Sequence, residues 1–316
     1  MSIRAINSRA INVQEIANEL STLRDLVRWG VSAFNEAGLS FVQGMPDAID
    51  EAVYLCLSAL HLPPDFSESF FDCVLTFEER VAVLENYKLR IQQNRQAAYI
   101  THEAWFAGLN FYVDERVLIP RSPIAELVQQ QFAPWIDVDD VGNVLDMCTG
   151  SGCIAIACAN VFDQAQVVAS DISKDALAVA AINCERYGLE QQLQLVQSNL
   201  YASIPQRQYD IIVSNPPYVS DDEMRTLSEE LRSEPALGLA AGESGLDVVI
   251  PILQGAREFL TDHGILVVEV GYTQPTLEHC LPNVPFFWLD FEHGGDGVFL
   301  LTAEQLEMYQ HDFDAL

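Results

Sequence analysis

Short β-favouring runs alternate with helical segments from about Ser122 onward, and few folds are compatible with that alternation. It predicts a doubly wound α/β domain in which helices cover both faces of a largely parallel sheet. The expected strands are residues 143–147, 167–170, 193–196, 209–213 and 264–270.

The last two apolar runs depart from this alternation. Residues 286–289 and 298–301 flank the glycine-rich segment His293-Gly-Gly-Asp-Gly297, with no helical segment between them. Two runs joined by such a turn predict an antiparallel hairpin. The expected sheet therefore has seven strands, mostly parallel, with an antiparallel last strand.

The first hundred residues have a helical pattern instead. Apolar residues at three- and four-residue steps predict helices over about 13–38, 46–61 and 77–98. Residues 98–121 are rich in β-favouring pairs, and a polar turn within 113–119 predicts a linking β-hairpin. The expected domains are thus a helical domain at 1–97, a linker at 98–121 and an α/β domain at 122–316.

The charge balance limits the partners of this chain. It has 16 Lys and Arg against 46 Asp and Glu, a formal net charge of −30. Residues 101–316 alone carry 8 basic and 33 acidic side chains, a net charge of −25. This argues against a nucleic-acid groove, because phosphates need cationic side chains. It suits a basic polypeptide partner, or an adaptation to solubility or salt.

Cysteine and histidine usage indicates neither a metal site nor a disulfide framework. The seven cysteines form no CxxC pair and the six histidines are scattered. The first ten residues are too polar for a secretory signal, and no apolar run approaches the ~20 residues of a membrane span. We therefore expect a cytoplasmic, metal-free protein whose cysteines are free thiols.

A glycine loop follows the first expected strand of the α/β domain, in Leu145-Asp-Met-Cys-Thr-Gly-Ser-Gly-Cys153. Glycines there allow a tight turn and a close approach of backbone to ligand. Asp171 ends the next strand, where its carboxylate can accept both ribose hydroxyls of a nucleoside. The loop lacks the third glycine of a dinucleotide site, so S-adenosylmethionine fits better, with Asp146 attracting its ammonium group. The predicted cofactor residues are Asp146, Thr149, Gly150, Ser151, Gly152, Asp171 and, bracketing the adenine, Asn199.

A second loop follows the strand 209–213 and reads Asn215-Pro-Pro-Tyr218. Ligands of open α/β sheets bind beyond the carboxyl ends of strands, which is where this loop should lie. Asn215 and the carbonyl of Pro216 can hold a planar –NH2 group, while Pro217 stiffens the loop and Tyr218 packs over the group. Such a site suits methylation of a nitrogen conjugated to a π system, through positioning and fixed dipoles rather than a strong base.

With both loops the chain resembles class I S-adenosylmethionine-dependent methyltransferases that methylate amino groups. It is most similar to the protein-(glutamine N(5)) methyltransferases, through the helical N-terminal domain, Phe106–Phe111, Val117-Leu-Ile-Pro-Arg121 and Asn-Pro-Pro-Tyr. Release-factor enzymes of this family carry Arg-Pro-Glu-Thr after Ile-Pro, whereas this chain has Arg121-Ser-Pro-Ile124. That difference and the ending His293–Phe299 resemble the branch acting on large-subunit ribosomal protein L-three.

The resemblance implies roles for several residues. Gly150, Ser151, Gly152 and Asp171 would bind the cofactor, and Asn215 to Tyr218, with Arg121, would bind the glutamine amide. Asn215 would also contact the cofactor, as would Leu200, which stands where the release-factor branch often has an aromatic cofactor contact. Three alternatives remain: a release-factor glutamine methyltransferase, an adenine-amino nucleic acid methyltransferase, and a non-catalytic binding module that keeps the fold. The sequence leaves the oligomeric state open.

Overall fold

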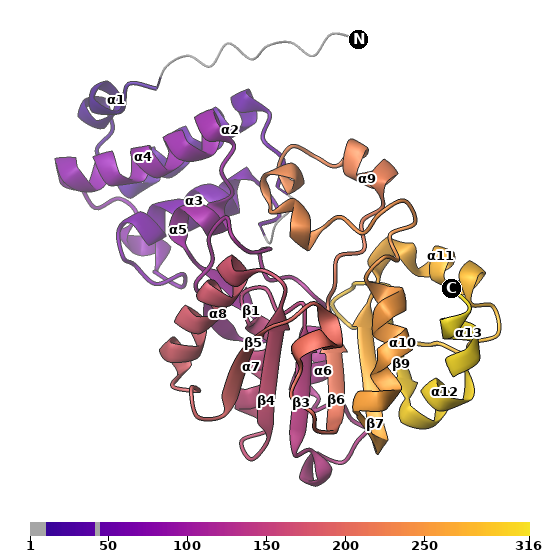
Figure 1. Ribbon diagram of the computed structural model, residues 1–316. Coiled ribbons are helices and arrows are strands. Elements are labelled where there is room, and N and C mark those ends of the chain that lie inside the picture. The colour runs from indigo at the N-terminus through magenta and orange to yellow at the C-terminus, as the bar shows by residue number, and fades with distance from the viewer. Residues whose placement is uncertain (1–10, 42–44) are drawn as a thin grey trace. The chain divides into compact units, whose positions relative to one another are not determined.

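The computed structural model describes residues 11–41 and 45–316, so the polar first ten residues lie outside the described part. Residues 143–302 contribute a seven-stranded sheet of order β5-β4-β3-β6-β7-β9-β8 (Figure 1). The predicted doubly wound sheet is confirmed. Its strands are β3 (Asn143–Met147), β4 (Gln166–Asp171), β5 (Leu193–Gln197), β6 (Tyr209–Ser214), β7 (Leu260–Glu269), β8 (Phe287–Trp288) and β9 (Val298–Thr302).

Strand direction sets the position of the functional loops. Strands β5, β4, β3, β6 and β7 are parallel, whereas β9 runs antiparallel to both β7 and β8, as predicted. The chain moves outward from β3 to β5 and then returns to the other side of β3 as β6. This reversal is a topological switch point, where open α/β sheets bind ligands. Met147 and Ser214, the last residues of β3 and β6, are direct partners across it.

Two apolar cores lie on opposite faces of the sheet, because successive side chains of a strand point to opposite sides. Val144 belongs to one core and Leu145 to the other, and β6, β7 and β9 alternate in the same way. The first core is completed by α6 (Ile124–Gln129) and α7 (Cys153–Val161), and by Cys184 of α8 (Lys174–Tyr187). The second is completed by α10 (Val249–Phe259), α11 (Gln274–Cys280), α12 (Ala303–Met308) and α13 (Gln310–Asp314).

The N-terminal residues form helices, with more breaks than predicted. The helices are α1 (Val13–Glu19), α2 (Leu23–Ala37), α3 (Ala48–Ala59), α4 (Phe77–Gln93) and α5 (Ala97–Thr101). A continuous helix over 13–38 is wrong, because Thr22 starts α2 with a capping box to Asp25. A continuous helix over 77–98 is also wrong, because Asn94 adopts a left-handed conformation that ends α4.

The linking hairpin is present, but not where the polar turn of 113–119 placed it. Its strands are β1 (Ala104–Phe106) and β2 (Leu109–Phe111), joined by Ala107 and Gly108 at φ of 50° and 81°. Two central residues with positive φ twist a two-residue turn to match its strands. Residues 113–119 form no strand; there, Asp114 accepts hydrogen bonds from the backbone and the guanidinium of Arg116.

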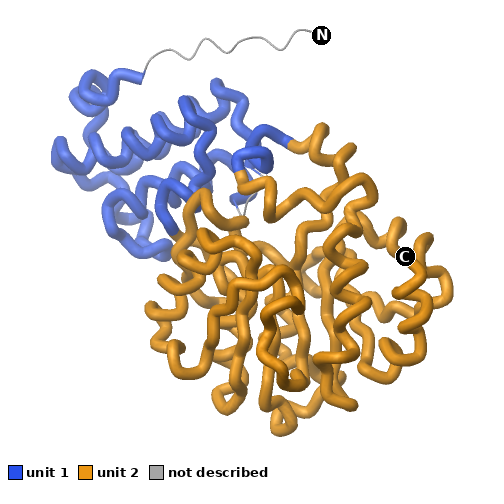
Figure 2. Tube along the Cα trace, viewed as in Figure 1, with its two compact units in different colours: residues 1–102, 228–233 blue, residues 103–227, 234–316 orange. Residues whose placement is uncertain are grey.

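The chain divides into two compact units, shown in blue and orange in Figure 2. The described residues up to His102 form the first unit together with Ser228–Ser233, and Glu103–Leu227 with Glu234–Leu316 form the second. Six residues that follow the Asn-Pro-Pro-Tyr loop and α9 (Asp221–Thr226) are therefore part of the first unit, hereafter the helical unit. Glu230 of this segment is buried there against Arg90. Among the described residues no helix is long and apolar enough to cross a membrane.

Candidate active site

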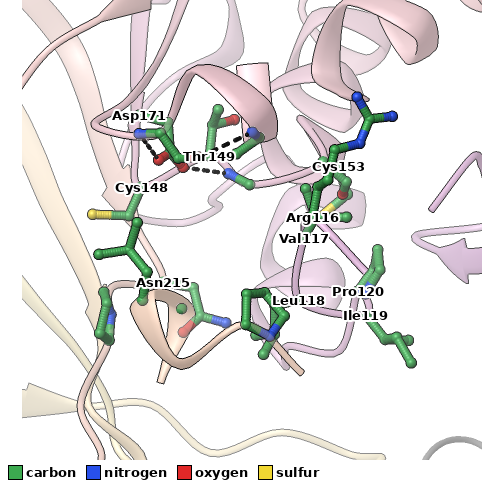
Figure 3. A pocket seen from close by; sticks show the side chains of 18 of the residues that line it. Arg116, Val117, Leu118, Ile119, Pro120, Cys148, Thr149, Cys153, Asp171 and Asn215 are labelled. Carbon is green, nitrogen blue, oxygen red and sulfur yellow. Dashed lines mark hydrogen bonds between the residues drawn. The ribbon is translucent and has the colours of Figure 1, made fainter. Parts of the chain in front are cut away.

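A cavity of about 350 Å³ opens at the carboxyl ends of β3, β4 and β6, in the second unit (Figure 3). Its walls come from the glycine loop after β3, the residues after β4, Asn215 and Pro217 after β6, and the segments 115–122 and 235–238. The cavity thus lies at the switch point of the sheet, where the two loops singled out in the sequence meet.

The glycine loop needs glycine at two positions for different reasons. Gly150 has a φ of 54° and faces open space, so a side chain there would be strained and would project toward the cavity. Gly152 has a φ of 81° and precedes α7, and a Cβ atom there would lie 3.2 Å from Ala180 Cβ of α8. Gly150 therefore shapes the cavity, whereas Gly152 allows two helices to pack closely beneath it.

Asp171 connects the glycine loop to the residues that follow β4. Its carboxylate accepts hydrogen bonds from Gly150 N at 2.9 Å and from Ser173 N at 2.8 Å, drawn as dashed lines in Figure 3. Burial raises the pKa of Asp171, and these backbone donors oppose that rise. Each carboxylate oxygen retains a second lone pair for a ligand hydroxyl. These two free acceptor positions fit the hydroxyls of a nucleoside ribose.

Asp146 is fully buried and does not line the cavity. Its Oδ2 accepts hydrogen bonds from Thr149 Oγ1 at 2.5 Å and from Ala155 N at 3.1 Å. Its Oδ1 is buried with no hydrogen-bond partner among the described residues, and burial raises the pKa of Asp146 to about 7. An acceptor left unpaired in a protein interior is costly, so a cationic donor in this region would be stabilised.

The Asn-Pro-Pro-Tyr loop is fixed to the first loop at its base, since Ser214 Oγ donates to the carbonyl of Met147 at 2.7 Å. Asn215 and Pro217 line the cavity, whereas Pro216 is buried. Tyr218 does not line it: its hydroxyl donates to Glu269 Oε1 at 3.0 Å, and burial raises its pKa. The asparagine is thus the polar side chain that this loop presents to a ligand.

Arg121 also lines the cavity and is paired with a buried carboxylate. Its Nη1 lies 2.7 Å from Glu234 Oε1, and Glu234 also accepts a bond from Ile119 N. Beside this part of the lining, Asp114 accepts hydrogen bonds from the guanidinium of the lining residue Arg116. The pKa of Asp114 falls to about 2 because that guanidinium donates to it. Arg121 therefore ties segment 235–238 to the wall 117–121.

The predicted site residues fall into two groups. Those lining the cavity are Arg121, Thr149, Gly150, Ser151, Asp171, Asn215 and Pro217. Those outside its lining are Asp146, Gly152, Pro216, Tyr218, Asn199 and Leu200. Leu200, in the 3₁₀ turn Leu200–Ser203, packs against the second core.

Several lining residues were not predicted. Ile172 and Ser173 follow Asp171, and Pro235, Leu237 and Gly238 lie far along the chain from both loops. Ile172 is 50% exposed, and an apolar side chain directly after a strand-ending carboxylate is a signal that the sequence offers. The residues 235–238 carry no comparable signal, because their position depends on the long-range pairing of Glu234 with Arg121.

Comparison with known proteins agrees with this architecture. Residues 129–242 match the Methyltransferase small domain family. The ribosomal protein uL3 glutamine methyltransferase of Francisella tularensis is 44% identical over 301 residues, covering 95% of this chain and 96% of that protein. The proteins of the same name from Neisseria gonorrhoeae and Bordetella pertussis are each 48% identical, covering 92% and 91% of this chain and 98% and 97% of theirs.

These matches extend over both units, and the predicted class I methyltransferase fold and the predicted relationship are confirmed. The chain belongs to the family of ribosomal protein uL3 glutamine methyltransferases.

Proposed function

We propose that this enzyme transfers a methyl group from S-adenosylmethionine to the side-chain amide nitrogen of a glutamine in ribosomal protein uL3. The observation that carries the proposal is the single cavity that Asp171 and Gly150 share with Asn215. A nucleoside-binding carboxylate and an amide-binding side chain thereby face one space. The proteins named for this activity align with nearly the whole chain.

The cofactor half of the site is proposed to hold the nucleoside through Asp171 and the backbone of Gly150. Asp146, buried behind the cavity lining, would attract the ammonium end through its charge rather than by direct contact, with Thr149 keeping the carboxylate in place. Ser151 and Gly152 form the turn into α7. Bound S-adenosylmethionine would supply an electrophilic methyl group on a sulfonium sulfur.

The acceptor half of the site is proposed to hold the glutamine amide. The side-chain oxygen of Asn215 and the carbonyl of Pro216 would accept its two amide hydrogens and turn its lone pair toward the methyl group. The nitrogen then forms the new N–C bond, the electron pair of the S–C bond stays on sulfur, and the nitrogen loses one proton to water. Fixed acceptors favour this step because they need no reorganisation.

Direct assay tests the substrate. The enzyme, labelled S-adenosylmethionine and purified uL3, release factor or DNA are incubated separately, and mass spectrometry locates the label. We expect one added methyl group on a uL3 glutamine. Label on the release-factor glutamine alone, on adenine or on lysine would contradict the proposal.

Three finer statements belong to the same proposal. The enzyme acts in the cytoplasm, where uL3 is made, and the net charge of −30 disfavours direct recognition of nucleic acid. The helical unit docks the protein substrate. The alternative is that this unit only stabilises the fold. Measuring uL3 binding by an enzyme that lacks the unit separates the two roles.

Replacing Asp171 with alanine should weaken S-adenosylmethionine binding by about 1.5–3 kcal/mol, the scale for losing a hydrogen bond to a charged partner. The change removes the ribose acceptor and frees Gly150 N and Ser173 N. Isothermal titration calorimetry measures it, with the exposed Asp163→Ala as control. Equal affinity in Asp171→Ala and wild type would move the ribose contact to another residue.

Salt should weaken the association with uL3 while turnover at saturating substrate changes little. Residues 101–316 carry a net charge of −25, and attraction between exposed charges is screened over ~8 Å at physiological salt. A series of initial rates against uL3 concentration at increasing salt measures this as a rising KM with a steady kcat. A KM independent of salt would remove the electrostatic part of the proposal.

A further inference from the structure

We propose that Glu269 is a positioning residue for methyl transfer, which holds the Asn-Pro-Pro-Tyr loop and the cavity wall at Ser122 in one fixed arrangement. This rests on the proposed function, because methyl transfer is one of its readouts. Glu269 is the last residue of β7, is 5% exposed and does not line the cavity.

Each oxygen of Glu269 accepts one side-chain hydroxyl. Ser122 Oγ donates to Oε2 at 2.5 Å and the Tyr218 hydroxyl to Oε1 at 3.0 Å. Burial raises the pKa of Glu269 to about 7, and its two hydroxyl donors and Arg121 oppose the rise. A buried carboxylate costs free energy that a leucine in the same place would not cost. Its two hydrogen bonds join Ser122 to Tyr218, which are 96 residues apart in the sequence. The carboxylate therefore fixes the position of one segment relative to the other.

Tyr218 is tightly packed at both its ring and its backbone. Its carbonyl accepts from Thr273 Oγ1 at 2.8 Å, and a Cβ on Gly245 would lie 2.6 Å from the same oxygen. A Cβ on Gly271 would lie 2.7 Å from the tyrosine ring. The ring and the backbone of Tyr218 are thus both set by contacts behind the loop, three residues from Asn215. Glu269 adds a hydrogen bond to the hydroxyl of Tyr218 and so fixes the polar end of this side chain.

The other end of the link is the segment that distinguishes this chain from the release-factor branch. Ser122 lines the cavity and also accepts from Ile124 N at 3.2 Å, at the start of α6. A Cβ on Gly295 would lie 2.8 Å from Pro123 Cγ, so the segment 293–297 packs against it. The two sequence signatures of the branch therefore meet beside Glu269, which joins them to Tyr218.

The test replaces Glu269 with glutamine, which keeps the shape but cannot accept at both positions. A loop displacement of about 1 Å costs up to about 100-fold in rate, so we expect kcat to fall by about tenfold to 100-fold. The Kd for S-adenosylmethionine should stay within about twofold of wild type, because Glu269 lies outside the cavity. Glu278→Gln, an exposed glutamate on α11, is the matched control.

Tyr218→Phe and the double variant complete the test, since Tyr218→Phe removes one of the two hydroxyls that the Glu269 carboxylate holds and so breaks the same link. We expect the double variant to lose little more kcat than the worse single variant. Fully additive losses, or wild-type kcat in Glu269→Gln, would overturn the proposal. Ser122→Ala, which removes only the other bond, serves if Glu269→Gln does not fold.

Hydrogen exchange separates this proposal from the choice of substrate. Peptides covering 117–124 and 214–222 should exchange faster in Glu269→Gln than in wild type and Glu278→Gln, with no acceptor present. If wild type does not methylate uL3 but exchange changes in this way, the substrate assignment fails and the link stands. Unchanged exchange in both peptides refutes the link whatever the substrate.

Discussion

Asn215→Ala should remove methyl transfer almost completely while leaving S-adenosylmethionine binding nearly unchanged. Asn215 is the polar side chain that the Asn-Pro-Pro-Tyr loop presents to the cavity, whereas the proposed cofactor residues Asp171 and Gly150 belong to other segments of its lining. Removing a preorganised hydrogen-bonding group lowers kcat by about 10²–10³-fold. We expect at least that loss, measured as single-turnover transfer to uL3 with both substrates saturating, and a calorimetric Kd for the cofactor within about twofold of wild type.

Asn215→Asp is the sharper variant of this pair. It keeps the side-chain oxygen acceptor but exchanges the –NH2 donor for a second oxygen and adds charge. If only the acceptor matters, its kcat should exceed that of Asn215→Ala; if the neutral amide is needed, both should be equally inactive. Wild-type turnover in Asn215→Ala would eliminate the proposed amide-binding role.

The sheet could be predicted because its signals are local. The alternation of apolar runs with helical segments, and the glycine segment 293–297 between the last two runs, require no knowledge of distant contacts. The wrong predictions fall where the sequence carries two conflicting signals for secondary structure. The pair Tyr99-Ile100 favours a strand by composition, yet it lies in α5 with Tyr99 buried. The capping box of Thr22 was present in the sequence and would have divided the first helix.

The site could be predicted only in part, for a related reason. Asp171 ends β4, and Gly150 and Asn215 lie in the loops after β3 and β6, so the sheet topology alone brings them together. Glu269 also ends a strand, but its partners Ser122 and Tyr218 are found only in three dimensions. The same holds for Glu234, whose pairing with Arg121 brings residues 235–238 into the wall. Long-range polar contacts of single side chains leave no period in a sequence.

Arg90→Met should destabilise the helical unit by about 3–5 kcal/mol, the scale for leaving buried charges without their partner. Arg90 is fully buried, and its guanidinium donates to Glu51 at 2.5 Å and to Glu230 at 3.2 Å. It also donates to Asn94 Oδ1 and to the carbonyl of Ser40. The substitution preserves most of the volume but leaves two buried carboxylates facing each other. Urea unfolding followed by far-ultraviolet circular dichroism measures the loss.

Two comparisons identify the cause of that loss. Arg24→Met breaks an exposed pair with Asp72 and should change the free energy of unfolding little. Burial raises the pKa of Glu51 even beside Arg90, so without Arg90 that pKa rises further above its unfolded value. The stability of Arg90→Met should therefore recover as pH falls and Glu51 takes up a proton, and decline as pH rises. A deficit that is equal at all pH values would point to lost packing instead of unpaired charge.

Since Glu230 lies in the segment that follows the Asn-Pro-Pro-Tyr loop, the same substitution should also lower kcat, whereas Arg24→Met should not.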